Sequence, residues 1–166
     1  YNTNPILFGD AQSLPIGSRC IDHCLLLDVL EHLPNPREAI AEIHRVLNSK
    51  GTLFLQVPFL YPIHDSPLDF HRWTEHGLRN LVEAEGFTVS KTIAIGHPLE
   101  TAALNSCIAI SKTVLNWLRA KNPLRISNFL IPFILFLINT SAWLFAKLSR
   151  EDSLMPYRYR FTCEKN

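Results

Sequence analysis

Ile21-Asp-His-Cys-Leu-Leu-Leu-Asp-Val-Leu-Glu-His-Leu33 is the stretch of this 166-residue chain that decides its fold. Residues 24–27 form an unbroken apolar run, which is typical of a strand that helices cover on both faces in a parallel sheet. A polar exit follows the run and leads into two prolines. In open α/β sheets, ligands bind at the edge where such strands end. We therefore expect this strand to deliver acidic and imidazole groups to a ligand-binding edge.

Composition narrows the class of protein. The chain is 47% hydrophobic and long enough to bury the core of one domain. Its net charge of +1 provides no field that would attract nucleic acid, so we expect no nucleic-acid partner. The four cysteines include no Cys-x-x-Cys pair, which fits reduced thiols in a cytosolic protein. Cys20, His23 and Cys24 are close enough to suggest metal ligands, but an ordinary strand with thiols explains them better, and no metal is expected.

The order of predicted elements is that of an α/β protein. Strands are predicted over residues 5–8, 21–27, 52–57 and 87–95, and helices over 37–47 and 75–85. Gly51 suits a left-handed cap after the first helix, and Thr74 suits the N-cap of the second. Strand and helix alternate along the chain, as they do in α/β folds.

Several motifs occur in an order that resembles class I S-adenosylmethionine-dependent methyltransferases. They are Gly9-Asp10-Ala11, Leu14-Pro15, Ile21-Asp22, Val29-Leu30-Glu31-His32-Leu33, Glu42-Ile43-x-Arg45-Val46-Leu47, Gly51 and Val57-Pro58. The nearest likeness is to the bacterial group with Glu-His-Leu-Pro and Arg-Val-Leu signatures, over about residues 5–95. This resemblance implies a Rossmann-like α/β sheet, S-adenosyl-L-methionine as the cofactor, and direct in-line transfer of a methyl group to an oxygen, nitrogen or carbon atom.

The resemblance also implies which residues bind the cofactor. Asp10 and Ala11 match the turn that holds the adenine ring after the family's third strand. Leu27 and Asp28 match the end of the fourth strand, beside the sugar and methionine part of the cofactor. His32 belongs to the loop that continues from there toward the methyl acceptor.

The sequence departs from the family in one major respect. Residues 1–166 contain no counterpart of the family's glycine-rich loop or of the acidic residue that grips the ribose hydroxyls. We therefore expect a class I methyltransferase sheet that lacks its first two strands, in an N-terminally truncated chain. Such a chain is expected to bind the cofactor weakly or not at all by itself.

A loop over residues 59–73 follows the third predicted strand and is rich in titratable groups. His64 is the first candidate for a general base, because an unperturbed imidazole titrates near neutral pH. Asp65 or Asp69 would orient it or replace it, and Arg72 would hold a substrate carboxylate or phosphate. The structural alternative is a self-braced loop in which Asp65 caps a turn and Arg72 pairs with Asp69.

An apolar helical insertion is predicted before the last strand. The predicted organisation is a methyltransferase part over 1–96, the insertion over 97–152, and a final antiparallel strand in 153–166. Residues 126–148 are long and apolar enough to cross a bilayer. A single crossing would separate the last strand from its sheet, so the segment is expected to be a re-entrant hairpin, an interfacial helix or a soluble lid. Basic residues and a tryptophan flank or interrupt it, as at an anionic interface: Arg119, Lys121, Arg125, Trp143, Lys147 and Arg150.

These patterns predict an enzyme that methylates a small-molecule, glycan or lipid-linked acceptor. It would be cytoplasmic, with membrane contact at the inner face through residues 126–148. The alternative is a non-catalytic, membrane-associated scaffold derived from a methyltransferase domain. A dinucleotide-binding oxidoreductase is less favoured, because it needs the same missing glycines. The oligomeric state is left open.

Overall fold

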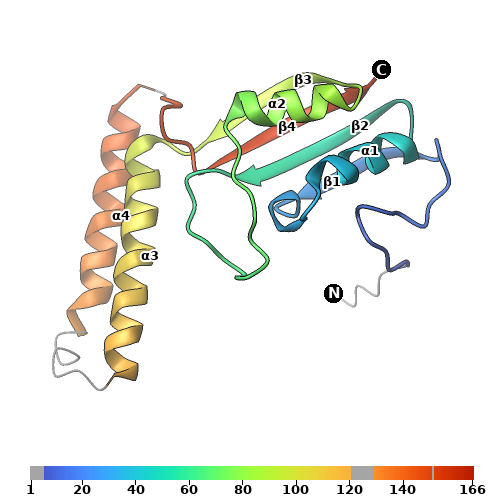
Figure 1. Cartoon of the computed structure of the whole chain (residues 1–166). Helices are drawn as coiled ribbons and strands as arrows, with labels where there is room; N and C mark the ends of the chain where they lie inside the picture. Colours follow the sequence, from blue (N-terminus) through green and yellow to red (C-terminus); the bar gives the residue numbers. More distant parts are fainter. Residues whose placement is uncertain (1–5, 121–128, 151) are drawn as a thin grey trace. The chain divides into compact units, whose positions relative to one another are not determined.

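A mixed sheet of four strands organises the first of two compact units in this computed structural model, which describes residues 6–120, 129–150 and 152–166. The strands are β1 (Ile21–Leu27), β2 (Leu47–Pro58), β3 (Phe87–Ile95) and β4 (Arg158–Lys165), in the spatial order β1-β2-β4-β3 (Figure 1). β1 pairs parallel with β2, and β4 runs antiparallel to β2. The predicted final antiparallel strand therefore lies inside the sheet, between β2 and β3.

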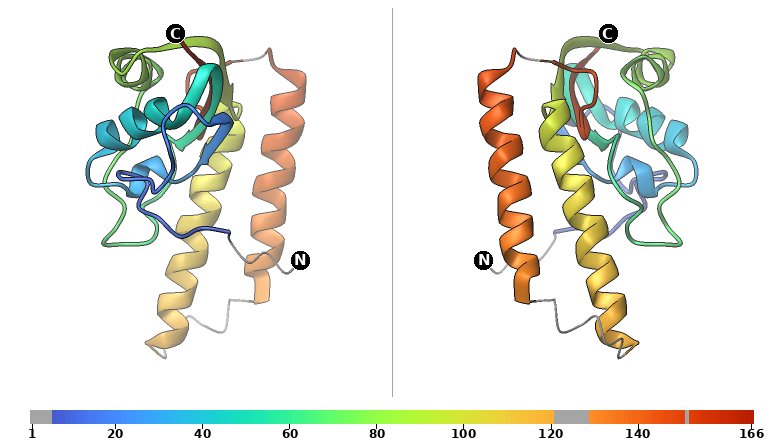
Figure 2. Two further views of the ribbon diagram at one scale, coloured as in Figure 1. Left: turned by 90° about the vertical axis from the view of Figure 1, so that its right-hand side faces the viewer. Right: turned by 90° about the vertical axis from the view of Figure 1, so that its left-hand side faces the viewer.

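Two helices, α1 (Pro36–Val46) and α2 (Glu75–Ala84), lie on the same face of the sheet (Figures 1 and 2). Each buries one apolar stripe, as their sequence periodicity predicts. The core of this unit combines these stripes with inward-facing strand residues. Its fully buried members include Ile40, Leu53, Leu55, Val57, Leu78, Val82 and Phe161.

Side-chain hydrogen bonds gather at the C-terminal end of α1. Glu42 accepts two bonds from Arg45, at 2.8 and 2.9 Å, and a third from the Leu14 backbone N–H at 2.9 Å. Arg45 also donates to the carbonyl of Leu14. Lys165, from the end of β4, donates to the carbonyls of His44 and Leu47 at the same C-terminal end of the helix. The Arg-Val-Leu motif thus fastens the chain before β1 to α1.

Two local predictions are wrong. Gly51 does not occupy a left-handed cap: α1 ends at Leu47 in an extended conformation, and the left-handed residue is Lys50, with φ of 65°, inside an irregularity at the start of β2. Gly51 is required there because a Cβ would lie 2.9 Å from the Asn48 carbonyl oxygen. The described residues of the predicted strand 5–8 form no strand, and Ile6 and Phe8 are fully or largely exposed. A strand needs a partner for its backbone groups, and no described segment supplies one to these residues.

Although β1 is apolar, its side chains are not buried on both faces of the sheet. Leu25 and Leu27 are 68% and 45% exposed, whereas Leu26 is buried. Among the described residues, the edge of β1 away from β2 pairs with no strand. The expectation of a strand covered on both faces is therefore wrong for the described part of the chain.

The second unit, Leu60–Pro62 with Ala94–Tyr157, is a hairpin of two long helices. α3 (Pro98–Arg119) begins at a capping box between His97 and Glu100, and α4 (Ile131–Leu148) lies antiparallel beside it (Figure 2). No residue of α4 is buried, and its 18 residues satisfy the length and hydropathy of a membrane span. Lys121 and Arg125, two of the predicted flanking bases, lie outside the described residues.

Candidate functional site

The loop after β2 docks on the short 3-10 helix η1 (Leu30–His32), which follows β1. The Phe70 N–H donates to the carbonyl of Glu31 at 2.9 Å. His32 Nδ1 lies 2.8 Å from the carbonyl oxygen of Leu68, which fixes the orientation of that ring. These contacts bring the predicted base, His64, next to His32, which was predicted to lie on the cofactor side. The two imidazole rings are packed edge to face, with their centroids 4.9 Å apart.

Asp69 is the organising group of this loop. Arg72 donates to both of its oxygens, at 2.5 and 2.8 Å, and the His64 backbone N–H donates at 2.9 Å. His64 Nδ1 lies 3.3 Å from Asp69 Oδ2. The Arg72 guanidinium holds the pKa of Asp69 well below its usual range, so the carboxylate is charged. The structure thus brings together three predicted catalytic residues, His64, Asp69 and Arg72. The pairing of Arg72 with Asp69 was also predicted by the alternative of a self-braced loop.

Asp65 lies apart from this group in the contacts that the structure describes. It is exposed and takes a left-handed conformation, with φ of 51°, that aspartate tolerates better than most residues. Its carbonyl accepts a hydrogen bond from the Leu68 N–H at 2.9 Å. Asp65 therefore shapes the turn through its backbone.

Glu31 is a site residue that the sequence did not single out. Its side chain is completely buried, and neither carboxylate oxygen has a hydrogen-bond partner within the described residues. The Nε2 atoms of His32 and His64 lie 3.7 and 3.8 Å from Glu31 Oε1. Burial raises the pKa of this carboxyl. The sequence contains a signal for Glu31, because this residue precedes His32 in the polar segment that follows a predicted strand.

Asp28 directly follows β1 at the predicted cofactor edge, with φ of 53°. Gln56 of β2 donates to its carboxylate at 2.7 Å, and Arg158 of β4 lies 3.4 Å away. Arg160 in turn donates to the amide oxygen of Gln56, at 2.8 Å. Asp28 is held in place yet part-exposed, so its carboxylate can accept further hydrogen bonds from a ligand. Leu27, the residue before it, presents apolar surface at the same strand end.

Asp10 and Ala11 form a turn before β1. Asp10 Oδ1 accepts from the Gln12 N–H at 2.9 Å, and its carbonyl accepts from the Ser13 N–H. Gln12 then accepts from the Asn35 N–H at the start of α1, 2.9 Å away. The predicted adenine-side turn is therefore tied to the loop that follows η1.

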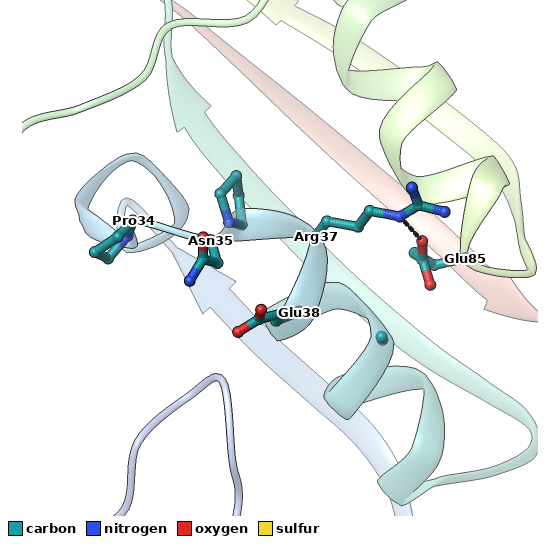
Figure 3. Close-up of a pocket in the computed structure, with 7 residues that line it drawn as sticks. Pro34, Asn35, Arg37, Glu38 and Glu85 are labelled. Carbon is teal, nitrogen blue, oxygen red and sulfur yellow. Dashed lines mark hydrogen bonds and ion pairs between the residues drawn. The ribbon is translucent and has the colours of Figure 1, made fainter.

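A hollow of about 490 Å³ opens at the start of α1, where the Arg37 guanidinium pairs with Glu85 (Figure 3). Pro34, Asn35 and Glu38 also line it. None of the predicted site residues lines this hollow. The titratable cluster of η1 and the loop after β2 is thus a separate feature.

Comparisons with known proteins agree on one class. A family model described as "Methyltransferase domain" matches residues 2–55. A Mycolicibacterium smegmatis protein described as a "probable S-adenosylmethionine-dependent methyltransferase" is 29% identical over 112 residues, which are 64% of this chain and 44% of that protein. The chain therefore spans less than half the length of that curated relative.

Solved structures share the fold at low sequence identity. The [4+2]-cyclase SpnF is 16% identical, with a TM-score of 0.57 over 95% of this chain and 54% of its own. A Galdieria sulphuraria protein, provisionally assigned as a sarcosine dimethylglycine methyltransferase, is 15% identical, with a TM-score of 0.54 over 95% of this chain and 57% of its own. These likenesses concern the fold alone.

The family-model match and the curated relative confirm the predicted resemblance to S-adenosylmethionine-dependent methyltransferases. The solved structures confirm the Rossmann-like α/β fold class. The cofactor that they imply is S-adenosyl-L-methionine. The chemistry of the Asp28 carboxylate, held but part-exposed at a parallel strand end, fits a hydrogen-bonding part of that cofactor.

Proposed function

We propose that the whole protein transfers a methyl group from S-adenosyl-L-methionine to an acceptor, and that the loop after β2 carries the acceptor side of the site. One observation carries this proposal: the loop that bears His64 and Asp69 docks on η1, which follows the end of β1 and Asp28. The family-model match over β1 and β2 supports it.

The cofactor side would be held by Leu27, Asp28 and His32, with Asp10 and Ala11 at its adenine end. When bound, the cofactor supplies an electrophilic methyl group, so the protein has mainly to align a nucleophile and remove its proton. Further strands are proposed to cover the open edge of β1 in the whole protein. The chain 1–166 alone should therefore bind the cofactor weakly, and micromolar affinity in a cofactor titration of this chain would contradict that.

On the acceptor side, His64 is proposed as the proton acceptor. Asp69 accepts from the His64 backbone N–H and lies 3.3 Å from Nδ1, so it orients the ring. Arg72 is placed to fix Asp69, and its remaining exposed surface would meet an anionic acceptor. Asp65 contributes through the shape of its turn.

The helical hairpin supports a hydrophobic or lipid-linked acceptor at the inner face of the membrane, in an otherwise cytoplasmic protein. Polar side chains of α4 bond to carbonyls of their own helix: Asn139 to Leu135, Ser141 to Ile138. Such internal pairing is what an apolar environment demands of polar groups. Lys147 lies 4.1 Å over the ring of Trp143 at the end of α4, a combination suited to the interface.

The test of the methyl-transfer proposal compares His64→Gln with His76→Gln in the full-length protein. His76 is an exposed imidazole of α2 and serves as the matched control. Loss of a general base lowers kcat by roughly 100-fold or more, while the affinity for S-adenosylmethionine should stay unchanged. Radiolabelled methyl incorporation into isolated membrane lipids and small-molecule extracts measures kcat, and a cofactor titration measures the affinity. Equal kcat in the two variants would remove His64 from the chemistry, and a full-length protein without cofactor binding would favour the scaffold.

The membrane proposal is tested by fractionation. Changing Phe133, Leu137 and Trp143 together to Asp should move the full-length protein from membrane to soluble fractions, because these side chains are 60%, 49% and 50% exposed. The control keeps these positions apolar, as Leu, Ile and Phe. An unchanged distribution of the Asp variant would contradict membrane contact through α4.

A further inference from the structure

We propose that Glu31, His32 and His64 form a binding site for a divalent transition-metal ion. Each residue offers one ligand atom, and the three atoms lie within 4.8 Å of one another. The residues come from η1 and from the loop that docks on it, and both belong to the same compact unit. We expected no metal because only ligands that are close together along the chain were considered. Spacing along the chain does not show that residues 32 and 64 lie close together in the fold.

The spacing of the ligand atoms fits an ion between them. Two ligand atoms about 2.0–2.1 Å from a tetrahedral zinc ion are about 3.4 Å apart. Glu31 Oε1 lies 3.7 Å from His32 Nε2 and 3.8 Å from His64 Nε2. These gaps are too long for direct hydrogen bonds. They would close to metal-ligand geometry with small side-chain shifts.

Glu31 is an independent argument for a cation. A completely buried carboxylate normally has hydrogen-bond donors or a metal, because burying an unpaired charge is costly. Both Glu31 oxygens lack a donor among the described residues, and Asp28 adds negative charge nearby. A divalent ion would supply the partner that this carboxylate lacks.

The imidazoles are also held as metal ligands usually are. His32 Nδ1 lies 2.8 Å from the Leu68 carbonyl oxygen, and His64 Nδ1 lies 3.3 Å from the Asp69 carboxylate. Carbonyl and carboxylate partners on one ring nitrogen fix the ring and direct the other nitrogen toward a metal. Arg72 anchors Asp69 in turn, so each of the two imidazole ligands has an outer partner.

The ligand types favour zinc or a related ion over magnesium or calcium. Two imidazole nitrogens and one carboxylate suit Zn²⁺, Mn²⁺ or Fe²⁺, whereas Mg²⁺ and Ca²⁺ take oxygen ligands. Three protein ligands leave one position open, as in catalytic sites. This use of the site rests on the proposed function: an acceptor hydroxyl bound at the open position would lose its proton more easily. With the ion bound, His64 would be a ligand and the hydroxyl proton would pass to water; His64 would be the proton acceptor in the metal-free protein.

The test titrates metal-stripped full-length protein with zinc ion alone, by isothermal calorimetry. One ion per chain is expected. Losing an outer-layer partner weakens metal binding about 10–100-fold, so Glu31→Gln and His64→Gln, which each remove a ligand, should weaken it by at least about 100-fold. His76→Gln should bind as the unaltered protein does. Equal zinc affinity in all four proteins, or no binding at millimolar zinc, would overturn the site.

A second measurement separates ligand loss from misfolding. Glu31→Gln keeps the shape of the side chain and removes its charge, so without metal it should melt no lower than the unaltered protein. Zinc should raise the melting temperatures of the unaltered protein and of His76→Gln, but not that of Glu31→Gln. Failed zinc binding with intact methyl transfer would overturn the metal site alone. Intact zinc binding without methyl transfer would overturn the proposed function alone.

Discussion

The sheet unit and the helical hairpin use similar apolar side chains in opposite ways. In the sheet unit, Leu53, Leu55 and Phe161 are completely buried. In α4, Phe133 and Phe136 are 60% and 62% exposed, and no residue is buried. The difference shows that hydrophobic content does not define a core; a core requires a second apolar surface on which to pack.

Their polar groups differ in the same way. The sheet unit pairs groups far apart in sequence, as Lys165 does with the carbonyls of His44 and Leu47. In α4, Asn139 and Ser141 each bond to a carbonyl of their own helix, and Asn139 also donates to Cys107 Sγ of α3 within the same hairpin. Long-range pairing makes a fold depend on a particular partner, whereas local pairing leaves a helix independent of its surroundings.

The largest effect expected from this comparison concerns two phenylalanines. Phe161→Ala should lower the free energy of unfolding by about 3–5 kcal/mol, because it leaves a cavity in the core of the sheet. Phe136→Ala should change it by less than about 0.5 kcal/mol, as for other exposed positions. Chemical denaturation of the full-length variants measures both values. A large loss for Phe136→Ala would mean that α4 is part of a packed core.

Two lysines give an intermediate effect. Lys165→Met should cost about 2 kcal/mol, because two carbonyls lose a buried donor. Lys147→Met should cost less than about 1 kcal/mol, since it removes an exposed cation–π contact. Thermal melting of both variants makes the comparison. Equal costs would show that the α1 carbonyls find water in place of Lys165.

The smallest effect depends on pH. The Arg45 side chain lowers the pKa of Glu42 to about 2 from an ordinary 4.5. Because the folded pKa is the lower one, the pair stabilises the fold fully above about pH 4.5 and loses its effect as the pH falls toward 2. Glu42→Gln should cost about 1 kcal/mol at pH 7, a value reduced by the partial exposure of the pair.

The measurement is the difference in unfolding free energy between Glu42→Gln and the unaltered protein at several pH values. That difference should shrink below pH 4.5. Glu38→Gln, at an exposed position of α1, is the control and should show little pH dependence. A constant difference across this range would show that the Glu42 carboxylate does not carry the stabilisation.

The sequence by itself determined the α/β class, the order of the elements and their approximate bounds. Strand β3 and the N-cap of α2 at Thr74 are as predicted, because alternation, helical periodicity and capping depend on neighbours in the chain. The same local signals failed at Gly51 and at residues 5–8. There the outcome depends on a bulge in β2 and on a partner strand, neither of which a local pattern contains.

Only the tertiary structure decided the make-up of the candidate site. His64 and Asp69 share a loop and were predicted together, but Glu31 joined them only because that loop docks on η1 through the Phe70 N–H and the Leu68 carbonyl. The burial of Glu31 without a hydrogen-bond donor is likewise a property of the packed fold. A chain pattern specifies which groups are available, whereas long-range backbone contacts decide which of them meet and how much water reaches them.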